Sequence, residues 1–368
     1  MTNSIIKIIV VNFIVLITTI LLIDIIFGHW FSSHSFGPYM REHRLKKNPA
    51  TLVYEGEKHN FVYKRNYHGF RGEEIDPSEI EAVIIGGSTT DERYKPEKFT
   101  ITGNLNYLLK NRGYKFKIVN AGIEGQSTAG HIYNFQHWFP KLKNFSPKLF
   151  IFYIGINDFS FRNYYKLSHN IGGDGHVKNP EFNQVLFDTF KSNSFFYDKL
   201  RILKHKYYLT TNTMKYDHNF FNKERLENYE YVDYKKALPF FQGVYQALPI
   251  NIYDIHHLKE KHKIIISNYL DRINILRNQV KNKNSAAIFI NQVQSDGLKN
   301  EERLFILNHS LIEYCKRENM NCIDLADKLD GKQNYWSDGM HTTALGSKVI
   351  SETIIDDLIS IIKKEKLF

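Results

Sequence analysis

The sequence predicts an α/β fold in which a parallel, doubly wound sheet is covered by helices on both faces. Three observations support this: short apolar runs rich in β-branched and aromatic residues, stretches of helical periodicity between them, and small or polar residues directly after several runs. Strands that alternate with helices need right-handed crossovers, which make neighbouring strands parallel. We expect a five-stranded sheet, with strands at residues 81–86, 116–122, 149–154, 286–290 and 322–325.

Helices are expected between these strands and after the last one, because the apolar residues there recur at helical spacing. The predicted helices cover residues 99–111, a segment ending at 138, 253–281, 301–318 and 343–363. A long stretch rich in Tyr, Phe, Asn and Lys follows the third strand and lacks clear periodicity. The predicted organisation is a membrane anchor at 1–28, a lead-in segment at 29–80, and a sheet domain at 81–368 with a helical insertion at about 160–250.

Composition indicates a globular protein and gives no sign of a nucleic-acid partner. Of the 368 residues, 42% are hydrophobic and 14% aromatic, so a sizeable core is expected. A formal net charge of +10 would suit a nucleic acid or an anionic membrane surface. The lysines are scattered, however, with no arginine-rich helix and no nucleic-acid-binding motif. We interpret the charge mostly as a solvated surface.

The apolar run at residues 5–27 is long enough to span a bilayer as a helix, with Lys7 and Asp24 reaching towards the two interfaces. A cleaved signal peptide is the alternative, but its apolar region is normally shorter, and no clear Ala-x-Ala site follows. We expect a single membrane anchor. Large domains cross the membrane largely regardless of nearby charge, so we expect the rest of the chain outside the cytoplasm.

Metal and disulfide chemistry have little support in the sequence. Cys315 and Cys322 are too few for a disulfide framework or a zinc site. They would either form one bridge in an oxidising compartment or remain as two thiols, and we expect the thiols. His131 and His137 are six residues apart, which does not place both on one helix face. We expect no metal and no other cofactor.

The first predicted strand ends in Gly86-Gly87-Ser88, a sequence that allows a sharp turn and leaves the serine at the carboxyl end of the strand. In open α/β sheets, ligands bind at this edge. Three further groups are expected at the same edge: Gly125, Asn157, and the pair Asp338 and His341 just before the last helix.

These residue types fit nucleophilic catalysis on an ester. A serine hydroxyl needs a base to take its proton, and His341 is suited to this role, with Asp338 three residues earlier to orient its ring. The tetrahedral oxyanion needs hydrogen-bond donors. The backbone N–H groups of Ser88 and Gly125 and the side-chain amide of Asn157 would supply them, each worth about 3 kcal/mol of barrier.

With these four motifs in this order, residues 81–362 resemble the SGNH hydrolases, or GDSL-like esterases and lipases. Ser88 matches the nucleophile block, Gly125 the glycine block, Asn157 the asparagine block, and Asp338-Gly339-Met340-His341 the closing motif. Gly87 stands where the family name places aspartate. The segment 69–72 also resembles one that precedes this domain in membrane-anchored bacterial members. The resemblance implies a flavodoxin-like sheet, no metal, and hydrolysis of acyl esters on lipids, small esters or sugars.

Structural interpretations of the same residues stay open. Asn157 is also suited to cap a turn, and Asp338 to cap the last helix. Asp158 is expected to be structural. The aromatic residues between 207 and 253 would either form a core or stack on sugar rings.

We therefore expect a membrane-anchored serine esterase that removes acyl groups, for example acetyl, from an envelope saccharide. Two alternatives are an acyltransferase with the same triad and a catalytically silent saccharide-binding protein. The complete set of triad and oxyanion residues argues against the silent protein.

Overall fold

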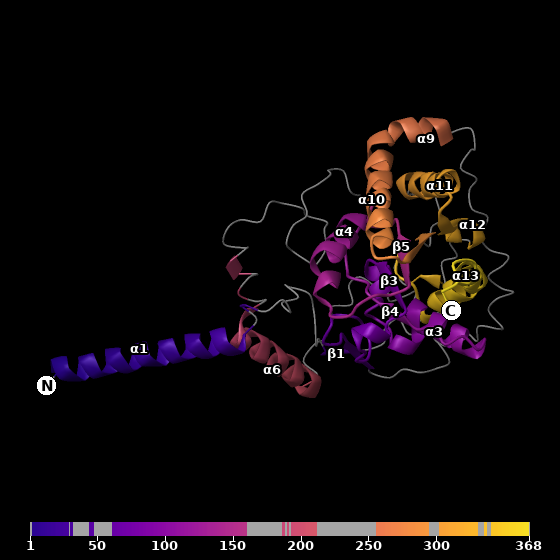
Figure 1. Ribbon diagram of the computed structural model, residues 1–368. Helices are drawn as coiled ribbons and strands as arrows, with labels where there is room; N and C mark the ends of the chain where they lie inside the picture. The colour runs from indigo at the N-terminus through magenta and orange to yellow at the C-terminus, as the bar shows by residue number, and fades with distance from the viewer. Residues whose placement is uncertain are drawn as a thin grey trace, which may run out of the picture.

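The computed structural model describes residues 2–28, 30–31, 44–47, 61–159, 186–187, 190, 193–211, 255–293, 302–329, 335–336 and 340–367 (Figure 1). The expected lead-in is therefore described in part. The expected insertion at about 160–250 is described mainly through one helix, α6 (Phe195–Thr211).

A five-stranded parallel sheet forms the centre of the structure, as the sequence predicted. Its strand order is β4-β3-β5-β6-β7, which is the flavodoxin-like order in which the first strand of the sheet lies between the second and third. The strands are β3 (Ala82–Gly86), β4 (Ile118–Asn120), β5 (Leu149–Ile154), β6 (Ala286–Asn291) and β7 (Asn321–Ile323). All four pairings between neighbours are parallel.

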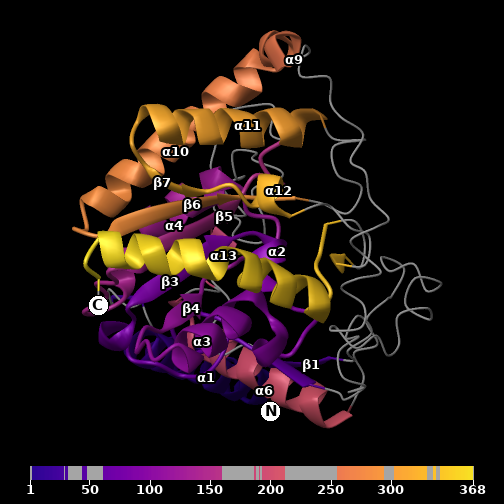
Figure 2. The same cartoon turned by 90° about the vertical axis from the view of Figure 1, so that its right-hand side faces the viewer.

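Helices cover both faces of this sheet (Figures 1 and 2). One face packs on α3 and α13, and the other on α4, α10 and α11. Successive side chains of a strand point to opposite faces of the sheet. Ile151 of β5 therefore packs in the core beneath α3 and α13, whereas Phe150 and Phe152 pack in the core beneath α4, α10 and α11. The helices are α2 (Ser88–Asp91), α3 (Ile101–Asn111), α4 (Thr128–His137), α9 (Ile255–Lys261), α10 (Lys263–Lys281), α11 (Glu302–Arg317), α12 (Leu325–Lys328) and α13 (Ala344–Lys364). Short 3-10 turns occur at Pro77–Glu79, Glu97–Phe99 and Phe139–Lys141.

The helix predicted at residues 253–281 is two helices. α9 ends at Lys261, and His262 has a non-helical backbone before α10 begins. Glu302 of α11 accepts hydrogen bonds from both Lys261 and His262. The break turns α9 onto α11, while α10 packs along α4 and the sheet (Figure 1). Periodicity along the sequence does not reveal such a change of direction, because both segments keep helical spacing.

The lead-in segment is built into the domain between residues 61 and 80. Strand β2 (Phe61–Lys64) pairs with β1 (Arg44–Lys47) in an antiparallel hairpin. Phe70 is fully buried against the ring of Trp138. The N–H of Arg71 donates a 2.9 Å hydrogen bond to the carbonyl of Asn120, so this segment covers part of the outer edge of β4.

Helix α1 (Thr2–Phe27) projects from the rest of the molecule (Figure 1). In the part of the chain that the structure describes, it is the one helix long and apolar enough to cross a membrane, over Ser4–Phe27 with a mean hydropathy of 2.8. A signal sequence and a single-pass anchor both meet this criterion.

Cys315 and Cys322 form a disulfide, so the expectation of two thiols was wrong. Cys315 lies near the end of α11 and Cys322 on β7. The chain reverses between them through Asn319, whose φ is +49°. This reversal brings the two Cα atoms to 6.2 Å, within the range that a disulfide requires.

Candidate active site

Ser88 is placed by the turn between β3 and α2. Strand β3 ends at Gly86, Gly87 is the N-cap, and Ser88 is the first residue of α2. A side chain at position 87 would collide with the side-chain nitrogen of Asn157. Glycine at this position therefore lets the Asn157 amide lie directly against the backbone that precedes Ser88.

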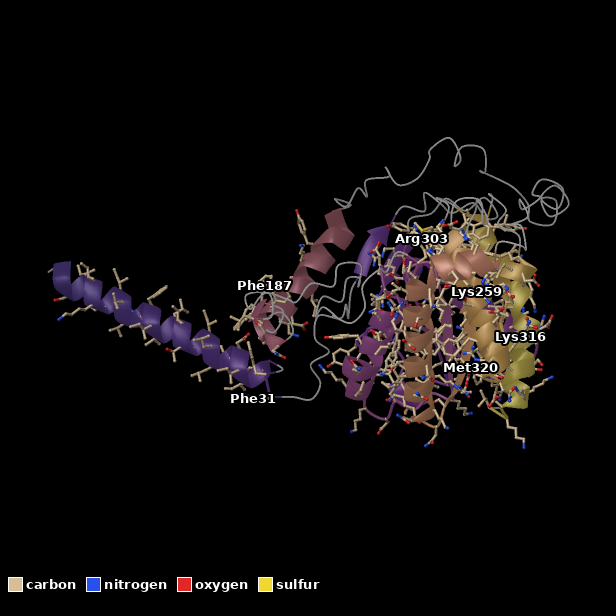
Figure 3. All side chains as sticks on the ribbon, turned by 90° about the horizontal axis from the view of Figure 1, so that it is seen from above. Phe31, Phe187, Lys259, Arg303, Lys316 and Met320 are labelled. Atoms are coloured by element: carbon tan, nitrogen blue, oxygen red, sulfur yellow. A yellow bond between two sulfur atoms is a disulfide. The ribbon has the colours of Figure 1, made fainter. Side chains whose placement is uncertain are left out.

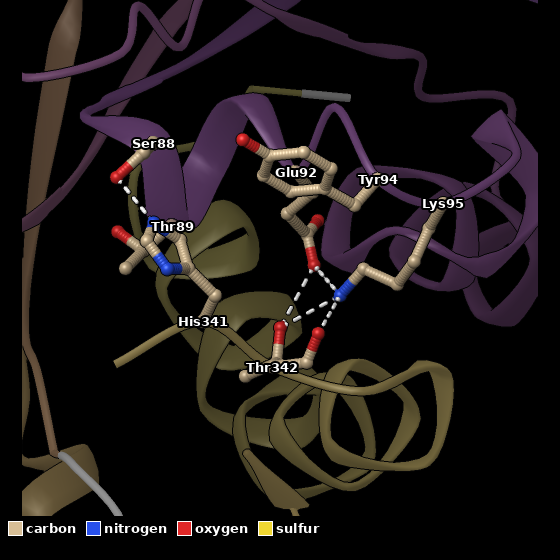
Figure 4. Close-up of a pocket in the computed structure, with 7 residues that line it drawn as sticks. All are labelled: Ser88, Thr89, Glu92, Tyr94, Lys95, His341 and Thr342. Atoms are coloured by element: carbon tan, nitrogen blue, oxygen red, sulfur yellow. Dashed lines mark hydrogen bonds and ion pairs between the residues drawn. The ribbon is translucent and has the colours of Figure 1, made fainter. Parts of the chain in front are cut away.

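The Ser88 hydroxyl and the His341 ring are in contact. Ser88 Oγ lies 2.7 Å from His341 Nε2, and Figure 4 draws this contact as a dashed line. For the ring to accept the serine proton, Nε2 must be unprotonated and the ring proton must be on Nδ1. The ring of Tyr94 stands edge-on to His341, with 6.4 Å between centroids. The predicted partner Asp338 lies outside the described residues.

The two other predicted groups lie beside Ser88. Gln126 N–H donates to the carbonyl of Ile123, which closes a turn with Gly125 at its third position. Gly125 has a φ of +75°, and a type II turn needs such a value at this position. The Asn157 amide donates a 2.8 Å hydrogen bond to the carbonyl of Gln126. The predicted groups Ser88, Gly125, Asn157 and His341 are therefore brought together at the carboxyl edge of the sheet.

Gln292, which the sequence analysis did not single out, connects two of these loops. It follows β6 and is 2% exposed. Its side-chain oxygen accepts from Ile156 N–H at 2.8 Å, and its nitrogen donates to Thr89 Oγ1 at 2.7 Å. Gln292 thus fixes the loop of Asn157 relative to the helix of Ser88. The available signal was a polar residue at the carboxyl end of a fourth strand.

A buried ion pair connects the helix of Ser88 to the segment of His341. Lys95 and Glu92 are each nearly inaccessible and lie 2.6 Å apart. Lys95 Nζ donates to both the carbonyl and the hydroxyl of Thr342, at 2.7 and 2.8 Å. The Glu92 carboxylate accepts hydrogen bonds from Thr342 and Ser347. Figure 4 shows part of this network beneath the serine–histidine pair.

Asp158 has a structural environment, as expected. It is buried, and Arg272 of α10 pairs with it at 3.1 Å. Its carboxylate also accepts from the N–H and hydroxyl of Thr128, the first residue of α4. A carboxylate at a helix N-terminus is favoured by the helix dipole. Asp158 therefore holds the Asn157 loop onto two helices.

Two arginines of the lead-in, Arg65 and Arg71, contact the last residue of α2. Arg65 forms a 2.8 Å ion pair with the buried Asp91, the last residue of α2, and Tyr63 donates to the same carboxylate oxygen. Burial alone would raise the pKa of Asp91, but the guanidinium groups of Arg65, Arg93 and Arg71 hold it below its usual value. Asp91 therefore stays ionised and anchors the nucleophile helix to the lead-in.

His131 on α4 lies behind the Gln126 turn and is 1% exposed. Its Nδ1 is 3.4 Å from the Gln126 side-chain oxygen. Burial lowers the pKa of His131 to about 3, so the ring is neutral at ordinary pH. No group of three or more His, Cys, Asp or Glu side chains is placed to hold a metal ion within the described ranges.

A small pocket opens beside the serine–histidine pair (Figure 4). Its empty volume is about 240 Å³, which includes space open to solvent. Ser88 and His341 are both half-buried, and both line the pocket. The lining residues are Ser88, Thr89, Glu92, Tyr94, Lys95, His341 and Thr342.

Comparison with known proteins gives resemblances in structure alone. No protein-family model matches the chain, and no curated protein matches its sequence. A member of the lipolytic G-D-S-L family from Veillonella parvula resembles it with 13% identity and a TM-score of 0.39, over 75% of this chain and 97% of that one. A psychrotrophic esterase from a Pseudoalteromonas species has 8% identity and a TM-score of 0.41, over 77% and 99%.

An acetyl-xylooligosaccharide esterase from Geobacillus also resembles the chain, with 13% identity and a TM-score of 0.40 over 75% of this chain and 93% of that one. At these values the likenesses establish no family. A functional assignment therefore depends on the site of the chain itself.

Proposed function

We propose that this chain is a serine esterase in which Ser88 is the nucleophile and His341 the general base. The observation that carries the proposal is the 2.7 Å contact between Ser88 Oγ and His341 Nε2, at a strand end where the Asn157 amide also lies. Nucleophile and base within hydrogen-bond reach are the geometric signature of this chemistry. Asp338 is proposed to accept a hydrogen bond from the Nδ1–H group of His341 and so to orient the ring.

In the proposed reaction, Ser88 Oγ attacks the acyl carbonyl while its proton passes to His341 Nε2. The carbonyl oxygen becomes an oxyanion that accepts hydrogen bonds from the N–H of Ser88, the N–H of Gly125 and the Asn157 amide. As the first residue of α2, Ser88 has no partner for its N–H within the helix. His341 then gives its proton to the leaving alcohol, which leaves an acyl group on Ser88.

Water completes the cycle. His341 takes a proton from the water, which attacks the acyl carbonyl, and the second tetrahedral intermediate collapses to release the carboxylic acid. His341 returns its proton to Ser88 Oγ. If a sugar hydroxyl replaced water in this step, the product would be a new ester, and the enzyme would be an acyltransferase.

We propose a short acyl group, such as acetyl, as the group removed. The position of Tyr94, which lines the pocket beside His341, supports this choice. For the alcohol portion we propose an envelope saccharide. Most of the aromatic residues expected to stack on a sugar, between 207 and 253, lie outside the described residues.

We propose further that α1 anchors the enzyme in a membrane with the sheet domain outside the cytoplasm. The apolar length of α1 supports the anchor. The disulfide between Cys315 and Cys322 supports the orientation, because disulfides persist in oxidising compartments and are rare in the cytosol.

The test is hydrolysis of a series of chromogenic esters of rising acyl length by the full chain in detergent. We expect a preference for the shortest acyl groups and loss of activity in Ser88→Ala. Ser78→Ala, a change at an exposed serine in the lead-in, is the matched control and should keep full activity. A fluorophosphonate probe should label Ser88 in the wild type. Hydrolysis by Ser88→Ala at the wild-type rate would overturn the proposal.

A further inference from the structure

Helix α6 carries a row of four apolar side chains, of which the last three are exposed to solvent and the first is partly buried. Phe196, Leu200, Leu203 and Tyr207 follow one another at intervals of four, three and four residues, which places them on one face of the helix. Leu200 is 64% exposed, and Leu203 and Tyr207 are each 60% exposed. We call these four residues the α6 stripe. An isolated exposed leucine is ordinary, but an aligned row on one helix face indicates a surface that is covered by something apolar.

Helix α6 is joined to the end of α1 by a specific set of contacts. Asp24 of α1 is 7% exposed, and its Oδ1 accepts hydrogen bonds from Ser194 Oγ at 2.8 Å and from Phe196 N–H at 3.1 Å. A carboxylate in this position caps the N-terminus of α6 and complements its dipole. Asp24 Oδ2 accepts from Trp30 Nε1 at 3.0 Å, and the rings of Phe27 and Phe195 are 5.7 Å apart.

This junction accounts for the acidic residue Asp24 in a largely apolar helix. It also places the start of α6 at the level where α1 would leave the hydrocarbon of a bilayer. Figures 1 and 3 show α6 running crosswise to α1 from this point. Phe31 and Phe187 lie beside the junction in Figure 3 and are 88% and 53% exposed. Aromatic side chains are typical of the membrane–water interface.

The charge of α6 complements an anionic surface. Its sequence has four Lys or Arg residues and a single acidic residue, Asp198. Lys199 and Lys204 are exposed next to the leucines of the stripe. Lysine stems extend along apolar surface while their ammonium groups reach the lipid headgroups. An apolar row with basic residues beside it is the pattern of a helix that lies in the plane of a membrane interface.

We propose that α6 lies flat in the interface of an anionic phospholipid bilayer, with the α6 stripe inserted among the headgroups and upper acyl chains. The inference rests on the proposed role of α1 as a membrane anchor. Two attachments that run crosswise to each other fix a molecule more firmly than one helix that can rotate about its axis. Because α6 also lies against strand β1, it would hold the sheet domain in a defined orientation to the membrane.

The test measures the depth of spin labels on the full chain reconstituted into vesicles of phosphatidylglycerol and phosphatidylethanolamine. Leu203→Cys carries the label on the stripe. Ile264→Cys is the matched control, since Ile264 is a 70% exposed apolar residue on α10. Figure 1 shows α10 well apart from α1. Accessibility to oxygen, which concentrates in lipid, is compared with accessibility to a water-soluble nickel reagent. Resistance of the wild type to carbonate extraction from its native membrane is measured in parallel and reports on α1 alone.

We expect the label at position 203 to be more accessible to oxygen than to nickel and the label at 264 to show the reverse. Vesicles of phosphatidylcholine alone should reduce the oxygen preference at 203. A water-exposed label at 203 in a carbonate-resistant chain would overturn the inference but leave the anchor intact. A label shielded from both reagents would show that protein, either the same chain or a second copy of it, covers the stripe, and would also overturn the inference. Extraction of the chain by carbonate would refute the proposed anchoring by α1, and with it the inference that depends on it. Esterase activity on soluble substrates is independent of all these outcomes.

Discussion

The ammonium group of Lys95 donates a 2.7 Å hydrogen bond to the carbonyl of Thr342, the residue that follows His341. Lys95 lies shortly after α2, and its charge is balanced by Glu92 at 2.6 Å. The segment that carries the proposed base is thus held by the region that carries the proposed nucleophile. Because each side chain is about 2% exposed, neither charge is compensated by water if its partner is lost.

Lys95→Met should therefore reduce both stability and turnover. Leaving Glu92 buried without its partner typically costs about 3–5 kcal/mol of unfolding free energy. The double variant Glu92→Gln with Lys95→Met removes both charges and should recover part of this stability. If Lys95 positions His341, kcat should stay about 10–100-fold low in the double variant, because a small misplacement of a catalytic group has such an effect. Recovery of kcat together with stability would show that the pair is structural only.

The packing of Asn157 on Gly87 gives a second prediction. Asn157→Ala should lower kcat by about 10²–10³, the usual cost of one oxyanion donor. Gly87→Ala should have a similar effect, because the added methyl group would displace the Asn157 amide. The double variant should then be no worse than either single variant, since both changes remove the same interaction. Additive losses in a double-mutant cycle of kcat would contradict a shared cause.

Much of the site was predictable because its main groups stand at the ends of recognisable strands. The apolar run before Gly86 and Gly87 predicts a buried strand followed by a turn. The apolar run that ends shortly before Asn157 predicts another. The supporting contacts were not predictable. Lys95 and Thr342 are 247 positions apart, and a lysine three positions after a glutamate normally indicates a solvated surface.

The same reasoning applies to Asp24 and Cys315. The partner of Asp24, Ser194, is 170 positions away in a stretch without clear periodicity, so the sequence suggested only that Asp24 reaches an interface. The pairing of Cys315 with Cys322 depends on the chain reversal at Asn319, which residue counting does not show. Local pattern predicts elements, whereas burial and long-range contacts decide what a polar residue does.

The disulfide provides a third prediction. If the full chain is denatured without reductant, a maleimide should label neither Cys315 nor Cys322, and after reduction it should label both. Replacing both cysteines with alanine should lower the unfolding free energy by about 2–3 kcal/mol, the value expected for a short loop. Mass spectrometry of the labelled chain checks the first statement and urea unfolding the second. Two labels per chain without reductant would contradict the disulfide and weaken the proposed location outside the cytoplasm.

His131 gives a prediction about stability and pH. Burial lowers the pKa of His131 in the folded chain to about 3, from 6.5 for an ordinary histidine. Between these values the unfolded chain binds a proton that the folded chain does not. The stability that depends on a neutral His131 is therefore fully present above about pH 6.5 and is lost as the pH falls below it. From pH 7 to pH 5 this one group should reduce the unfolding free energy by about 2 kcal/mol.

Replacing His131 with Gln removes this titration, and the variant should therefore lose about 2 kcal/mol less than the wild type between pH 7 and pH 5. Urea unfolding of the full chain in detergent at the two pH values measures the difference. His256→Gln, the same substitution at an exposed position on α9, is the matched control. An equal pH dependence in the wild type and in His131→Gln would mean that His131 takes up its proton in the folded chain. The packing behind the Gln126 turn would then have to admit a charge, and with it water, next to the proposed oxyanion donors.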